Sequence, residues 1–119
     1  MIINFKKLLK SFGYAFAGLR FAFSEQTFRI FCLAAAAVIF FMFWFKISLF
    51  EKVILILTIT LVMTLELINS RIERVLDFLQ PDHDPRIKVI KDISAGAVFL
   101  ACLGALAIGI LIFWPYLVK

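Results

Sequence analysis

The sequence is poor in the residues on which most soluble active sites and structural metal sites depend. Its 119 residues include one histidine, two cysteines, five glycines and three prolines, and only 18% of them are charged. Cys32 and Cys102 each lie inside an apolar run without a nearby cysteine or histidine, so we expect them to be packing residues. The sequence therefore carries no disulfide framework, Cys/His metal spacing or Ser-His-Asp set, and no glycine-rich phosphate loop or protein-kinase signature.

What the chain has in excess is apolar surface. Its residues are 64% hydrophobic, 15 of them are phenylalanine, and the mean hydropathy is +1.04. Soluble domains are about 45–50% apolar and about 25% charged. A chain of this size could not bury so much apolar surface in water. The composition excludes an ordinary soluble enzyme and a disordered tail, and it predicts one small integral membrane domain over residues 1–119.

Three apolar segments are long enough to cross a bilayer, at about residues 29–50, 53–79 and 92–118. Ahead of them, residues 4–24 carry a helical stripe of Phe and Leu side chains opposite a basic face with Lys6, Lys7 and Lys10. Such a helix is typical of one lying in the headgroup plane. We therefore predict an all-α membrane protein with an N-terminal amphipathic surface helix and three transmembrane helices.

The basic residues indicate how the chain is oriented. The net charge is +5, from 13 Lys and Arg against 8 Asp and Glu, and the cations cluster between the apolar runs. The N-terminal segment and the loop between the second and third spans hold most of them. We interpret this pattern as membrane topology rather than nucleic-acid binding, and it predicts a cytoplasmic N-terminus.

The third span also predicts association between chains. Small residues recur there every four positions, at Ala97, Ala101, Ala105 and Gly109. Because small residues let helix backbones approach closely in lipid, we expect an oligomer.

The second span carries a polar stripe in the half that approaches the proline-containing loop. Glu66 interrupts the apolar run, and at 100° per residue the polar side chains after it lie within about 60° of its direction. These side chains are Asn69, Ser70, Glu73 and Asp77. Arg71 and Arg74 are expected to point away from the stripe. Since a charge within a bilayer costs about 2.5–3.5 kcal/mol even on lenient scales, Glu66 must face protein or a polar cavity, and we interpret it as functional.

This stripe suits phosphoryl transfer to a lipid hydroxyl, a reaction that depends on alignment and charge neutralisation. Glu66 and Glu73 are separated by about 10 Å along the helix axis. The outer carboxylate can hold Mg²⁺ together with substrate phosphates. The inner one, which removal from water makes a stronger base, can take the hydroxyl proton. Glu25 and Asp92 precede the first and third spans and are expected to converge on the same boundary, where Lys91 adds a cation suited to phosphate. The alternative for the outer carboxylates is simple solvation where the helix leaves the membrane.

Three stretches carry motifs in order along nearly the whole chain. They are Gly13-Tyr14-Ala-Phe-Ala-Gly18-Leu-Arg20 with Glu25 and Phe28-Arg29, then Glu66-Leu-Ile-Asn69-Ser-Arg-Ile-Glu73-x-Val-Leu-Asp77, then Lys91-Asp92-Ile-Ser-Ala-Gly96-Ala. Together they closely resemble the prokaryotic diacylglycerol kinase / undecaprenol kinase family. The resemblance implies a homotrimer in the bacterial inner membrane. Its composite active sites would lie between subunits at the cytoplasmic face, with ATP as co-substrate and Mg²⁺ as cofactor.

The resemblance also implies roles for individual residues. Glu66 matches the family's general base, and Glu25 and Glu73 match metal carboxylates that also engage the ATP phosphates. Further positions around the nucleotide are matched by Tyr14, Asn69, Asp77, Lys91 and Asp92. Contacts on the lipid side are matched by Arg20 and Trp44.

Two places depart from the family pattern. Arg71 stands where a small residue is usual. In the loop between Pro81 and Pro85, aligning the prolines puts Asp84 where a histidine is common and His83 one place earlier. His83 and Asp84 remain candidate nucleotide contacts, although a histidine between two aspartates in a loop is commonly only solvated.

Other interpretations remain at this point. The segment from Lys46 to Glu51 and the proline-bracketed loop resemble the undecaprenol kinase branch, while diacylglycerol stays open as the substrate. A non-catalytic oligomeric scaffold or an ion-conducting helix bundle would also use small residues and an intramembrane glutamate. A basic amphipathic anchor for a soluble partner would explain the N-terminal segment but leaves Glu66 without a purpose.

Overall fold

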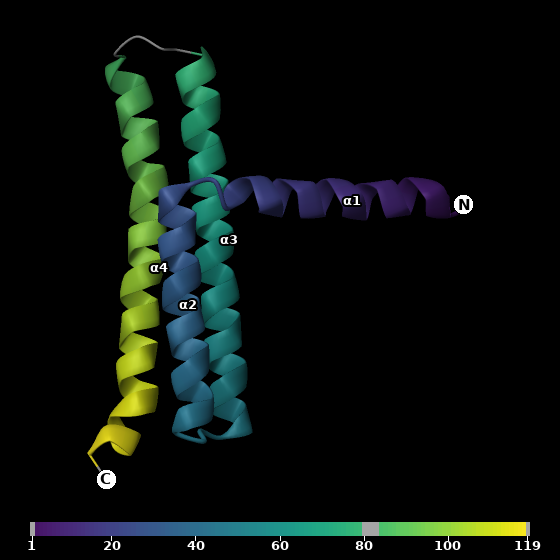
Figure 1. Cartoon of the computed structure of the whole chain (residues 1–119). Helices are drawn as coiled ribbons and strands as arrows, with labels where there is room; N and C mark the ends of the chain where they lie inside the picture. The colour runs from purple at the N-terminus through teal and green to yellow at the C-terminus, as the bar shows by residue number, and fades with distance from the viewer. Residues whose placement is uncertain (1, 80–83, 119) are drawn as a thin grey trace.

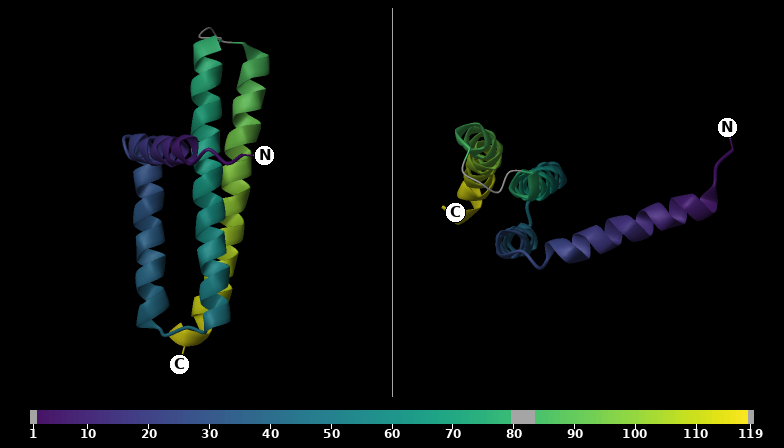
Figure 2. Two further views of the ribbon diagram at one scale, coloured as in Figure 1. Left: turned by 90° about the vertical axis from the view of Figure 1, so that its right-hand side faces the viewer. Right: turned by 90° about the horizontal axis from the view of Figure 1, so that it is seen from above.

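The computed structural model describes residues 2–79 and 84–118, and all regular structure in these ranges is helical. The helices are α1 (Phe5–Ala22), α2 (Gln26–Trp44), α3 (Leu49–Leu79) and α4 (Pro85–Leu117). Figure 1 shows α2, α3 and α4 running side by side, while α1 extends sideways across their direction. Seen from above in Figure 2, α1 leads away from the other three helices.

Helix lengths divide the molecule into a bilayer-sized part and a projecting part. The helices α2, α3 and α4 are each long and apolar enough to cross a membrane. With 19 residues, α2 is about 28 Å long, close to the thickness of the hydrocarbon layer. The 31 residues of α3 and the 33 of α4 extend well beyond that thickness. Figure 1 shows that their excess length lies past the level of α1, toward residues 80–83.

The turn from α2 to α3 is built around a lysine in the left-handed region. Lys46 has φ 51°, and the Ile47 N–H donates to the Met42 carbonyl at 3.5 Å. This is the hydrogen bond of a Schellman cap, in which the residue after the helix adopts the left-handed conformation. Ile47 and Met42 also belong to one buried cluster, which supplies the hydrophobic contact that accompanies such a cap.

The start of α3 is held by a capping box. The Ser48 N–H donates to Glu51 Oε1 at 3.0 Å, and the Glu51 N–H donates to Ser48 Oγ at 3.2 Å. The Tyr116 hydroxyl near the end of α4 donates to the same Glu51 oxygen at 2.7 Å. One carboxylate therefore ties the α2–α3 turn to α4.

Buried apolar packing concentrates at this same end of the helices. The cluster consists of Met42, Ile47, Leu55 and Ile112, with Phe45 and Tyr116 packed against it. Along the bundle α4 packs mainly on α3, and α2 packs less extensively on α3. Most large apolar side chains elsewhere are exposed in the single chain, as expected where lipid or another subunit covers them.

Helix bounds differ from the expected spans at both connections, including the start of α3, which begins at Leu49 rather than at about residue 53. The first apolar run was expected to continue to residue 50, but α2 ends at Trp44 because the Lys46 turn interrupts it. The third span was expected from about residue 92, but α4 begins at Pro85. Asp84 caps its N-terminus by accepting the Arg86 N–H at 2.9 Å, and proline suits the first helical position.

Candidate active site

Glu66 lies on α3 at the level where α1 meets the bundle. It is about 25 Å along the axis from the first residue of α3, by the helical rise. At the end of α1, the Phe21 ring lies 5.9 Å from the Arg71 guanidinium carbon. The carboxylate is therefore near one end of a bilayer-length segment, and α3 continues beyond it. The side chain is buried, with the residue only 6% exposed.

The polar stripe of α3 is buried at its inner end and opens outward. Asn69 and Ser70 are each 8% exposed, whereas Glu73 is half-buried. Asn69 Nδ2 donates to Glu73 Oε1 at 3.4 Å, and the Ser70 hydroxyl donates to the Leu67 carbonyl at 3.0 Å. Glu66 is close enough to Glu73 and Glu25 to experience their negative charges. The stripe thus combines carboxylates with a buried amide.

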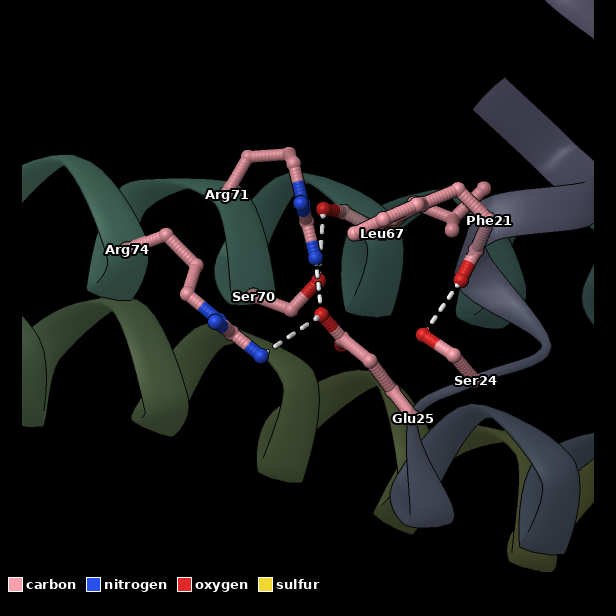
Figure 3. A network of polar contacts seen from close by, with 7 residues as sticks. All are labelled: Phe21, Ser24, Glu25, Leu67, Ser70, Arg71 and Arg74. Carbon is pink, nitrogen blue, oxygen red and sulfur yellow. Dashed lines mark hydrogen bonds and ion pairs between the residues drawn. The ribbon is translucent and has the colours of Figure 1, made fainter. Parts of the chain in front are cut away.

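Glu25 reaches this region from the turn between α1 and α2. It occupies the N-cap position of α2 without a side-chain capping bond. Its carboxylate instead accepts from the Arg71 guanidinium, and Arg74 lies 3.7 Å away. Figure 3 shows both arginines of α3 directed at the same Glu25 oxygen. Two cations and one anion thus meet where α1, α2 and α3 come together.

Arg71 and Arg74 were expected to point away from the polar stripe of α3, and that expectation did not foresee that both reach Glu25. Both arginines are exposed, as residues off the buried stripe should be. Helical angles describe where a side chain leaves its helix, and they do not account for a carboxylate that approaches from another element. Because Glu25 comes in from the α1–α2 turn, the long arginine side chains reach it.

Two further ion pairs lie on the projecting parts of α3 and α4, and one of them connects the two helices. Lys91 of α4 pairs with Asp77 of α3, and Lys88 pairs with Asp92 at 2.6 Å within α4. Lys91 is the less exposed of the two lysines, with 33% of its side chain accessible. Of the sequence-derived nucleotide residues in this hairpin, Lys91 and Asp77 therefore pair with each other, while Asp92 pairs with Lys88.

Asp84 stands at the far end of the hairpin. Its carboxylate accepts from the Arg86 guanidinium at 3.0 Å as well as from the Arg86 N–H. These bonds hold the pKa of Asp84 below its ordinary value. His83, the other candidate of this loop, lies outside the described residues.

The remaining candidates lie exposed on α1 and at the end of α2. Tyr14 and Arg20 are exposed on α1, and Arg20 lines a shallow hollow with Phe16 and Phe21. Trp44 ends α2, about 28 Å along that helix from Glu25. It is 67% exposed and stacks on Phe40 with ring centroids 5.9 Å apart. One chain therefore brings together Glu25, Glu66 and the polar residues of α3, but not the full set.

The oxygen donors of α3 suit a hard divalent cation such as Mg²⁺. Asn69 Oδ1 is buried and has no hydrogen-bond partner among the described residues, which leaves an acceptor available beside Glu73. Within the same part of the chain, no group of three or more His, Cys, Asp or Glu residues forms a closed metal cage. Mg²⁺ usually uses one or two carboxylates plus substrate phosphates, so the residues present fit it.

Sequence reasoning missed the arginine pair at Glu25 and the Tyr116–Glu51 contact. A signal for the second was available, because Ser48-x-x-Glu51 has the spacing of a capping box. No local pattern announces the first, which joins residues 46 positions apart.

Comparisons with known proteins identify relatives of this chain. The profile of the prokaryotic diacylglycerol kinase family matches residues 13–113. An undecaprenol kinase of Bacillus subtilis is 37% identical over 112 residues, covering 93% of this chain and 91% of that protein. A diacylglycerol kinase of Synechocystis is 39% identical over 104 residues, covering 86% of this chain but 59% of that protein. A diacylglycerol kinase of Escherichia coli K12 is 29% identical over 114 residues, covering 95% and 93% of the two chains.

Proposed function

The chain belongs to the prokaryotic diacylglycerol kinase family of bacterial membrane lipid kinases, and on that premise we propose how it works. It transfers the γ-phosphoryl group of ATP to the primary hydroxyl of a membrane lipid at the cytoplasmic face. The observation that carries the proposal is the buried Glu66 carboxylate at the level of α1, with Asn69, Ser70 and Glu73 continuing outward along α3.

Glu66 is the general base. It accepts the proton of the lipid hydroxyl while that oxygen attacks the γ-phosphorus. The new O–P bond forms, the bond from the γ-phosphorus to the bridging oxygen breaks, and ADP leaves. Burial withdraws the carboxylate from water, so a lipid hydroxyl at this depth is the proton donor at hand. Such a base contributes about 10²–10⁴-fold to the rate.

The outer residues bind and align the nucleotide. Glu73 and Glu25 are the proposed ligands of Mg²⁺, and Asn69 Oδ1, which has no hydrogen-bond partner among the described residues, is a third oxygen on the residue that contacts Glu73. When bound, Mg²⁺ neutralises charge on the phosphates. Lys91, with Asp77 holding its ammonium group, supplies a further positive charge on the nucleotide side. Tyr14, Asp84, His83 and Asp92 complete the proposed nucleotide contacts.

The lipid approaches from the bilayer side of Glu66. Arg20 on α1 is the proposed headgroup contact, and Trp44 contacts the substrate toward the opposite end of α2. Undecaprenol is slightly favoured over diacylglycerol because the α2–α3 turn and the proline-bracketed loop resemble that branch. Both lipids present a single primary hydroxyl at the interface.

We further propose that residues 1–119 act as a single membrane domain within a homotrimer, with composite sites between subunits. Support comes from the exposed apolar faces of the chain, including a groove of about 390 Å³ on α3 that is lined by Leu67, Ile68, Arg71, Ile72, Val75 and Leu76. The helix α1 lies in the headgroup plane, since it leads away from the bundle and exposes both its apolar and its basic residues. The N-terminus is cytoplasmic.

Lipid phosphorylation by the purified protein tests this function. Labelled ATP is supplied with undecaprenol and diacylglycerol in parallel, with and without Mg²⁺. The expected result is Mg²⁺-dependent labelling of at least one lipid by the wild-type protein. Absence of labelling for every lipid hydroxyl offered, with the protein folded, would refute the proposal. No feature of the described residues favours the non-catalytic scaffold or the ion-conducting bundle. Cation flux in liposomes, together with a lack of ATP binding, would support them instead.

A further inference from the structure

The Glu25 carboxylate makes no hydrogen bond to the first turn of α2, the helix that it precedes. A side chain at an N-cap position ordinarily accepts a hydrogen bond from the first turn of its helix. Glu25 makes no such bond with α2, and 15% of its side chain is exposed. Its carboxylate is directed instead at the arginines of α3 (Figure 3).

Arg71 is the principal partner of Glu25, and it is itself held in place. Its guanidinium donates to Glu25 Oε1 and lies 5.9 Å from the Phe21 ring centroid, so carboxylate and aromatic ring fix it from two sides. Arg74 is the looser partner, at 3.7 Å and with 67% of its side chain exposed against 47% for Arg71.

From this contact we propose that Arg71 is a positioning residue that occupies the Glu25 carboxylate in the nucleotide-free protein and competes with the divalent cation for it. The inference rests on the proposed function, in which Glu25 is a metal ligand. A cation that binds Glu25 competes with the guanidinium, because both are attracted to one negative charge and Arg71 already engages Oε1. Arg71 thereby lowers metal affinity until the nucleotide supplies additional ligands.

The size of the effect follows from the exposure of the pair. Half-exposed ion pairs carry modest coupling, so removal of the competitor should tighten metal binding by about two- to fivefold. Arg74, with a longer contact and greater exposure, should have a smaller effect. Lysine at position 71 retains a positive charge and should restore much of the competition.

Direct metal binding tests the proposal. Mn²⁺ binding to the full-length protein in detergent micelles is measured by electron paramagnetic resonance without nucleotide. The variants are Arg71→Gln, which keeps the stem over Phe21, and Arg71→Ala, with Arg71→Lys as the rescue and Arg74→Ala as the matched control. The same Arg71→Gln change is also made together with Glu25→Gln. We expect tighter Mn²⁺ binding in the first two variants, near wild-type binding in Arg71→Lys, and no gain from Arg71→Gln once Glu25 is neutralised.

The outcomes separate this inference from the function on which it rests. Unchanged or weaker Mn²⁺ binding in Arg71→Gln, together with loss of binding in Glu25→Gln, overturns the role of Arg71 and leaves Glu25 as a ligand. An equal gain in Arg71→Gln and Arg74→Ala also overturns it, because only net charge would then be sensed. Wild-type binding in Glu25→Gln removes Glu25 from the proposed metal site, and the inference falls with it.

Discussion

Replacing Glu66 with glutamine should change stability and turnover in opposite directions. The substitution keeps the shape of a side chain that is 6% exposed but removes its charge. Glu73 is about 10 Å away along the helix axis, a separation at which two like charges repel by about 1.7 kcal/mol at an effective dielectric constant of 20. Glu25 adds to this repulsion. With Glu66 ionised, we expect Glu66→Gln to raise the free energy of unfolding by about 1–2 kcal/mol and to lower turnover by about 10²–10⁴-fold.

Glu51→Gln is the matched control for this experiment. Glu51 lies on the same helix, but its carboxylate accepts hydrogen bonds from Ser48 and Tyr116. Replacing the charged acceptor of these hydrogen bonds by a neutral amide should lower the free energy of unfolding by about 1 kcal/mol. Turnover should stay near that of the wild type. Reversible unfolding in mixed micelles gives the free energies, and labelled ATP with a lipid hydroxyl gives the rates. Turnover of Glu66→Gln within about threefold of wild type would refute the role as base. A loss of stability in Glu66→Gln would refute the charge-repulsion argument.

Three other experiments probe the framework. Lys46→Gly should raise the unfolding free energy by about 0.5–1 kcal/mol, since glycine adopts the left-handed conformation without steric cost; a decrease in the same unfolding assay would contradict the Schellman cap. Leu55→Ala should lower the free energy of unfolding by about 1–3 kcal/mol. This is less than in a soluble core, because moving a leucine side chain from protein to lipid costs little and only the cavity left by the substitution destabilises the protein. An unchanged unfolding midpoint would argue against the buried cluster. Reversing the pair by combining Asp77→Lys with Lys91→Asp should recover the stability that each single change loses, about 0.2–1 kcal/mol for an exposed pair, while the KM for ATP stays raised. Recovery of that KM by the double variant would show that the pair matters only structurally.

Much of the helical architecture could be predicted because hydropathy and periodicity are local properties. The polar stripe followed directly from helical spacing, and the structure buries Glu66 together with Asn69 as a charge in an apolar span requires. The start of α4 at Pro85 was not predicted, because the span was drawn from hydropathy alone, although Asp84 followed by Pro85 is a strong pair of helix-initiation signals.

Other features depend on contacts that no window of sequence contains. Lysine has no special preference for the left-handed conformation, so nothing local marked Lys46 as the end of α2. The ion pair between Arg71 and Glu25 arises because the α1–α2 turn meets the side of α3, and that is a property of packing. A helical wheel gives the direction in which Arg71 leaves α3, and it does not show that a flexible guanidinium can reach a carboxylate on a neighbouring element.

The unequal helix lengths have a consequence for where the two substrates meet. The helix α2 has about the length of one hydrocarbon layer, while α3 and α4 continue past α1. The pair of α3 and α4 therefore passes from the hydrocarbon core of the membrane into the aqueous phase. A water-soluble phosphate donor and an acceptor that never leaves the bilayer can then be served by consecutive turns of α3. A phosphorylated lipid headgroup is too strongly hydrated to enter the hydrocarbon core. The product therefore leaves along the membrane plane rather than toward the bilayer midplane. The depth of the reactive carboxylate, more than the shape of any enclosed cavity, would then decide which hydroxyls are modified.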